Sequence, residues 1–232
     1  MAILSAMQSA AIRLLGQKPN TFFGAQGAFE LEIADLVNEV ARDIVKYQDW
    51  QALIYFAPIN GDGSTAIFPL PEDYDRMLTD SRVQDTSNWF WGYRRLLDVN
   101  IAARVDAGAW VGYPGGWMIL RNELRFFPAP ATGSTALYPY ISRYYAKDAG
   151  TQQVKGEFNA DSDEFVLPER LLTLGLIWRW REQKKLDGTG DQEAFVKALD
   201  EYAAKDKGAR VYRSNSRGHI PGVGVAWPWE LG

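Results

Sequence analysis

The residues of this chain best suited to chemistry are three neighbouring carboxylates, Glu72, Asp73 and Asp75. Two carboxylates that face each other across a groove can hydrolyse a glycosidic bond, one as the acid and the other as base or nucleophile. The same residues follow Pro71 at the end of a strand-like segment, where Asp side chains commonly bond to backbone N–H groups of a turn. We interpret them as a turn. The alternative interpretation is that these carboxylates belong to a carbohydrate-binding or glycan-cleaving β module that stacks sugars on tryptophan.

The other candidate sites have weaker patterns. The single histidine, His219, lies in a segment rich in Gly and Pro, which cannot hold a catalytic base in place. The absence of cysteine excludes disulfides, thiolate ligands and a thiol nucleophile. Asp161 to Glu164 lacks the alternating ligands of a calcium loop and is interpreted as the cap and first-turn charge of the helix that follows. Gly112 to Gly116 is interpreted as a turn. We therefore expect no enzyme, no metal and no cofactor.

Composition is that of an ordinary globular protein, with 47% hydrophobic and 23% charged residues among 232. The net charge of −4 argues against a general nucleic-acid binder held by phosphate contacts. We find no signal peptide and no apolar run long enough to cross a bilayer, and so expect no membrane partner.

Helical periodicity marks both ends of the chain. Ala2 to Leu15 and Phe29 to Tyr47 repeat apolar residues every three or four positions. Leu167 to Leu186 is apolar on almost every face between Leu171 and Trp180, which predicts a helix buried on most sides. Asp191 to Lys207 predicts the last helix.

Residues 50–148 are instead rich in aromatic and β-branched residues, interrupted by clusters of Gly, Pro, Asn and Asp. This pattern favours antiparallel strands, with a short helix between Asp98, its expected cap, and Ala107. The clearest hairpin pairs Trp117–Leu120 with Leu124–Phe127. The expected strands are Ala52–Ile59, Thr65–Leu70, Trp89–Arg95, Trp117–Arg121, Leu124–Phe127 and Ala136–Tyr145.

The predicted fold class is therefore α+β. A helical bundle is built from both ends of the chain, residues 1–49 and 149–207. An antiparallel β module, residues 50–148, is inserted between them, and an extended C-terminal tail, residues 208–232, follows.

Four segments carry a resemblance to a known family: Leu36 to Val40, Asp49 to Leu53, Leu70 to Arg76, and Leu171 to Leu186. In this order they are similar to segments of the head-to-tail adaptor proteins, also called connector or head completion proteins, of tailed bacteriophages. The resemblance spans roughly residues 1 to 207, and none of the four segments is a catalytic motif.

The resemblance implies a structural virion protein at the head–tail junction, made in the host cytoplasm. It implies a dodecameric ring under the portal protein, which extends the DNA channel and gives the tail nozzle or tail tube protein a docking site. DNA would pass through without specific binding.

An acidic stripe runs along the helix at Phe29 to Tyr47. It has two interpretations: a solvated helix face, or a negative channel lining that lets DNA pass without sticking. Its members are Glu32, Asp35, Glu39 and Asp43.

The tail after Gly208 combines Gly and Pro, which prevent independent folding, with many apolar residues. Such a segment gains structure on a partner, and Trp and Arg are common interface hot spots. In the resembling family a C-terminal extension reaches the portal. The expected portal-docking residues are Arg213, Arg217, Ile220, Val223, Val225, Trp227 and Trp229. The alternative is a tail that folds back over its own helical bundle.

Overall fold

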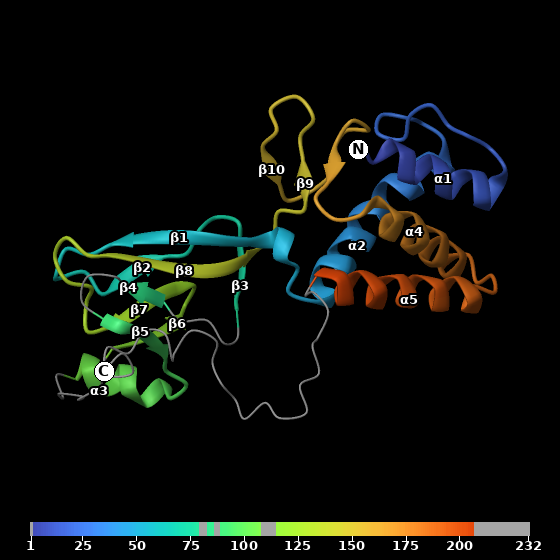
Figure 1. Ribbon diagram of the computed structural model, residues 1–232. Coiled ribbons are helices and arrows are strands. Elements are labelled where there is room, and N and C mark those ends of the chain that lie inside the picture. The colour runs from blue at the N-terminus through green and yellow to red at the C-terminus, as the bar shows by residue number, and fades with distance from the viewer. Residues whose placement is uncertain (1, 79–82, 86–88, 108–114, 207–232) are drawn as a thin grey trace, which may run out of the picture.

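The computed structural model describes residues 2–78, 83–85, 89–107 and 115–206. It confirms the predicted α+β class: one end of the molecule is helical and the other is a β module (Figure 1). The helices are α1 (Leu4–Leu15), α2 (Ala28–Tyr47), the short 3-10 helix η1 (Gln51–Leu53), α3 (Val99–Asp106), α4 (Glu169–Gln183) and α5 (Thr189–Asp206).

Helix α4 packs against α1, α2 and α5. Its face toward the core carries Leu171, Leu172 and Leu176, all with 0% exposure. Gly175 lets the neighbours approach closely, because a Cβ built there would lie 2.4 Å from Val40 Cγ1 of α2. Burial of apolar area by these leucines is the main stabilising contribution of the helix.

Complete burial of α4 stops at Ile177, earlier than the sequence predicts. Trp178 is only half-buried and stacks on Phe195 of α5, with ring centroids 5.5 Å apart. Trp180 is also half-buried and meets Phe29 of α2 edge-on at 5.8 Å. The two indoles therefore lie at the edge of the core and not at its centre.

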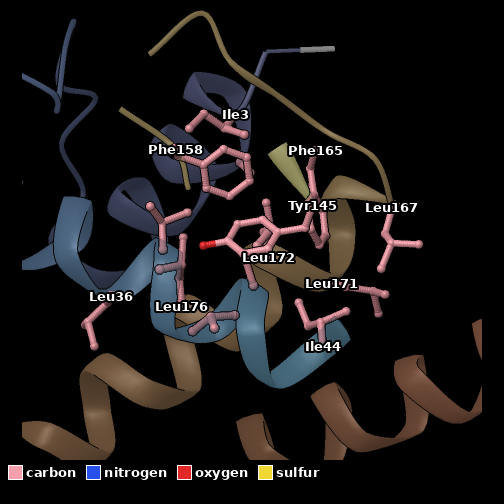
Figure 2. Close-up of a cluster of buried hydrophobic side chains, with 14 of the residues drawn as sticks. Ile3, Leu36, Ile44, Tyr145, Phe158, Phe165, Leu167, Leu171, Leu172 and Leu176 are labelled. Atoms are coloured by element: carbon pink, nitrogen blue, oxygen red, sulfur yellow. The ribbon is translucent and has the colours of Figure 1, made fainter. Parts of the chain in front are cut away.

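A small three-stranded sheet completes the helical core. Its strands are β9 (Ala146–Lys147), β10 (Val154–Lys155) and β11 (Glu164–Phe165), in the order β10-β9-β11. Tyr145, Phe158 and Phe165 from this region pack edge to face on one another among the core leucines (Figure 2). Residues 145–167 thus belong to the helical core, including Tyr145 and Ala146 from the segment expected in the β module.

The larger sheet runs in the order β1-β8-β4-β5-β6-β7-β2, and β3 also pairs with β8. Its buried residues, among them Tyr93, Trp117, Phe126 and Tyr138, form a second hydrophobic cluster. Its strands are β1 (Ile54–Asn60), β2 (Ile67–Pro69), β3 (Tyr74–Met77), β4 (Val83–Asp85), β5 (Trp89–Arg95), β6 (Gly116–Leu120), β7 (Glu123–Phe127) and β8 (Thr135–Ser142).

The predicted all-antiparallel arrangement is wrong at one place: β5 pairs with β6 in parallel. The physical reason is α3, since a parallel pair needs a crossover connection and a helix supplies it. The predicted cap of this helix is correct, because Asp98 Oδ1 accepts from the Asn100 N–H at 2.8 Å. The β6–β7 hairpin is also confirmed, and its turn residues Arg121 and Asn122 have positive φ, as this tight turn type requires.

None of the described helices is both long and apolar enough to cross a membrane.

Candidate functional surfaces

Two of the three candidate carboxylates, Asp73 and Asp75, make structural contacts at the turn between β2 and β3. The Tyr74 N–H donates to the Pro71 carbonyl at 3.0 Å, which closes the predicted turn. The Asp73 carboxylate accepts from the Tyr140 hydroxyl at 2.9 Å, and burial together with this hydrogen bond raises the pKa of Tyr140. Asp75 pairs with Arg76 at 2.5 Å. Asp73 and Asp75 are thus engaged in structural contacts, and these contacts do not favour the glycan alternative.

The acidic segment before α4 also has structural partners, but not the predicted ones. Asp161 accepts from the N–H groups of Phe22 and Phe23 at 3.0 and 3.1 Å. Asp163, fully buried, accepts from the Asn159 N–H at 2.8 Å and pairs with Lys155 at 2.8 Å.

The expectation that this segment caps α4 is therefore wrong. Strand β11 separates the segment from the helix, which begins at Glu169 without a side-chain cap. Within the described residues, no cluster of His, Cys, Asp and Glu could hold a metal ion. His219 and most of the Gly112 to Gly116 segment lie outside the described residues.

The acidic stripe of α2 faces α4 for most of its length. Asp43 lies 2.7 Å from Arg179, and Glu39 lies 3.7 Å from the same guanidinium. Glu32 accepts from Lys184 at 2.6 Å and from the Trp180 indole at 3.1 Å, and the Lys184 hydrogen bond lowers the pKa of Glu32.

Asp35, the fourth member of the stripe, is exposed to water. Three of the four carboxylates thus form a charged seam between α2 and α4. The sequence signal for that seam is the group of cations at the end of α4: Arg179, Arg181, Lys184 and Lys185.

Two of the segments that carry the family resemblance, Asp49 to Leu53 and Leu70 to Arg76, meet where the helical part joins the β module. Asn38 of α2 accepts from the Phe158 N–H at 2.8 Å and the Tyr145 hydroxyl at 3.0 Å. The buried Trp50 donates its indole N–H to the Ile44 carbonyl at 2.8 Å. Arg76 of β3 reaches Asp49 at 2.9 Å and so fixes the β module to the end of α2. These contacts stabilise the scaffold.

A hollow of about 500 Å³ lies at the same junction, lined partly by Arg42, Asp75, Arg143 and Glu157. Arg42 lies 3.8 Å from Glu157, and Arg143 donates to the Glu72 carbonyl. Much of the charge on its walls is already partnered within the chain.

An uncovered apolar surface lies on the outside of β1 and β8. The register sets Phe56 opposite Pro139 and Pro58 opposite Leu137. Phe56 is 66% exposed and Leu137 is 43% exposed. We call these four residues the outer sheet face. The sequence indicates this face, because β1 and β8 carry apolar residues on both sides of the strand. A strand with one side in water normally alternates between apolar and polar residues.

Among the described residues the structure thus offers one exposed apolar face, and several of its carboxylates stabilise the scaffold. A family model described as SU10 adaptor protein matches residues 1–219. The chain belongs to this family. A search of curated proteins found no match. Family membership confirms the predicted resemblance and a structural role as a bacteriophage adaptor in the virion. The expected tail residues, from Arg213 to Trp229, lie outside the described residues.

Proposed function

We propose that this chain is the head-to-tail adaptor that forms a ring, of twelve copies, beneath the portal. The ring extends the DNA channel and gives a tail nozzle or tail tube protein its docking site. The observation that carries the proposal is the family match over residues 1–219. It is supported by a fold in two parts with separate hydrophobic clusters, because the helical part and the β module can each contact a different partner.

We assign the α2 stripe to the channel side of this ring. The carboxylates of Glu32, Asp35, Glu39 and Asp43 outnumber the cations paired with the stripe, Arg179 and Lys184, so the stripe stays negative. A negative channel lining does not attract the phosphates of DNA, so the DNA can pass along it without binding.

We assign the tail, from Arg213 to Trp229, to the portal. Its apolar residues and basic charge suit a partner surface that is apolar and acidic. The portal would then organise the ring by holding one tail from each copy.

The experiment is to mix the purified chain with purified portal rings. Sedimentation should show a monomer or small oligomer for the chain alone, and electron microscopy should show a ring of it on the portal. Failure to bind the portal would contradict the proposed function. A stable closed ring of the chain alone at low concentration would contradict the organising role of the portal.

A further inference from the structure

The outer sheet face is apolar, yet its residues Phe56 and Leu137 are exposed to water. Phe56, Pro58, Leu137 and Pro139 form two directly opposed cross-strand pairs without a charged group between them. Exposed apolar patches of this kind mark interaction sites. Pro58 also removes an N–H from the edge strand β1, so that pairing with another strand is hindered. The partner of this face must therefore recognise it mainly through side chains.

The C-terminal segment of the same chain starts near the beginning of β1. Helix α5 ends at Asp206, whose carboxylate accepts from the Gln51 N–H at 2.9 Å. Gln51 opens η1, which leads directly into β1. Figure 1 shows the end of α5 next to the start of β1. The chain beyond Asp206 thus begins a few residues from Phe56.

The length and the composition of the C-terminal segment both suit binding to the outer sheet face. Residues 207–232 could span up to roughly 86 Å when extended, several times the length of β1. Trp227, Pro228 and Trp229 stand near its end, and flat aromatic and proline rings match a face made of Phe, Leu and two Pro residues. The segment has too much apolar surface to stay in water, and the face needs apolar cover.

We propose that in the free chain the C-terminal segment packs on the outer sheet face of its own molecule, through Trp227 and Trp229. This goes beyond the portal-bound role proposed above, because it concerns the chain before assembly. The same residues serve the face and the portal, so the two contacts exclude each other. Binding to the portal therefore removes the cover and exposes the outer sheet face only on the assembled particle.

The test uses the full chain, which has no cysteine of its own. Thr135→Cys lies at the end of the outer sheet face, opposite Asn60, and leaves the four face residues intact. It is combined with Ala226→Cys and treated with a short bis-maleimide cross-linker that contains a reducible disulfide. The matched control combines Ala226→Cys with Leu97→Cys, because Leu97 is 82% exposed and lies outside this face.

We expect an intramolecular cross-link in the monomer for the Thr135→Cys pair and a several-fold lower yield for the Leu97→Cys pair. Adding Phe56→Asp should lower the first yield to that of the control. Equal yields for the two pairs would overturn the proposal, and so would a cross-link mainly between molecules, which would assign the face to a second copy. If Phe56→Asp does not fold, the comparison of the two pairs decides alone, since both positions are exposed.

The cross-linked chain then separates this inference from the proposed function. It should fail to bind portal rings until the linker is reduced. Normal portal binding without any selective cross-link would overturn the inference and leave the proposed function standing. A selective cross-link with no portal binding after reduction would support the inference and overturn the proposed function.

Discussion

The Arg179 side chain of α4 donates from Nη2 to the Asp43 carboxylate of α2 at 2.7 Å. Its Nη1 lies 3.0 Å from Glu182, and Glu39 lies 3.7 Å from Nη2. The Asp43 hydrogen bond raises the pKa of Arg179, which is therefore charged at all relevant pH values. One guanidinium thus links two helices of the core through several carboxylates. All of these groups are partly exposed, so water weakens each pair.

Arg179→Ala should lower the free energy of unfolding by about 1 kcal/mol, because a partly exposed network stabilises modestly. A double-mutant cycle with Asp43→Ala should give a coupling of about 0.5 kcal/mol that shrinks in high salt. Urea denaturation measures both. Arg170→Ala, an exposed arginine on the same helix, is the control and should change stability little. Full additivity of Arg179→Ala and Asp43→Ala would contradict the seam.

Glu32 predicts a pH dependence. The Lys184 hydrogen bond lowers its pKa in the folded state, so its contribution is present above the unfolded pKa of about 4.3. That contribution is lost as the pH falls through the folded pKa. Glu32→Gln should therefore lower the melting temperature at pH 7, and the difference from the parent should close in strong acid. A difference that persists unchanged in acid would show that the carboxylate charge is not its source.

Gly175 tests the packing of α4. Ala in place of Gly normally favours a helix by about 1 kcal/mol. Here the added Cβ would lie 2.4 Å from Val40 Cγ1 and 3.1 Å from the Phe195 ring, so crowding should win and destabilise by about 1–3 kcal/mol. Val40→Ala should partly rescue Gly175→Ala, because it removes the clashing methyl group. Thermal melting checks this, and stabilisation by Gly175→Ala would show that the helices are not this close.

The helices were predictable from local signals, either apolar periodicity or, for α4, a continuous apolar run. Helices α2 and α5 begin within a few residues of the predicted positions. Long-range contacts were not predictable. Trp178 looks like a core residue in sequence, yet its place at the edge depends on where α5 crosses α4. Glu32 and Asp43 look like a solvated stripe until the basic end of α4 is placed beside them. The outer sheet face depends on a register that pairs residues about eighty positions apart.

Asp35 gives the cleanest test of the channel assignment. Changing the whole stripe to Lys would also break the pairs with Arg179 and Lys184, and lost stability would obscure any effect on DNA. Asp35 is exposed, so Asp35→Lys should leave the melting temperature nearly unchanged. Repeated in every subunit, the added cation should slow DNA ejection from particles through phosphate attraction.

The control for Asp35 is Glu193→Lys, an exposed charge reversal on α5. Ejection at the parental rate from Asp35→Lys particles, or equal slowing by Glu193→Lys, would remove α2 from the channel wall.

The C-terminal segment provides the last prediction. Within the part of the chain that the structure describes, the two larger hydrophobic clusters draw their buried residues from Ile3 to Leu199. We therefore expect a chain ended at Lys207 to keep its cooperative unfolding. It should nevertheless lose binding to portal rings, because the proposed anchor is gone. A truncated chain that unfolds would place the tail in the core, and one that binds normally would place the anchor elsewhere.

Single substitutions in the full chain should show which chemistry anchors the tail. If Trp227 and Trp229 fill pockets on the portal, either Trp→Ala change should weaken binding by about 2 kcal/mol, roughly thirtyfold. Arg213→Ala should cost less and its effect should fade with salt, because a charge at the rim of an interface acts through a screened field. Titration of each variant against portal rings at low and high salt measures both effects. A larger loss from Arg213→Ala than from either tryptophan would assign the anchor to charge rather than to apolar burial.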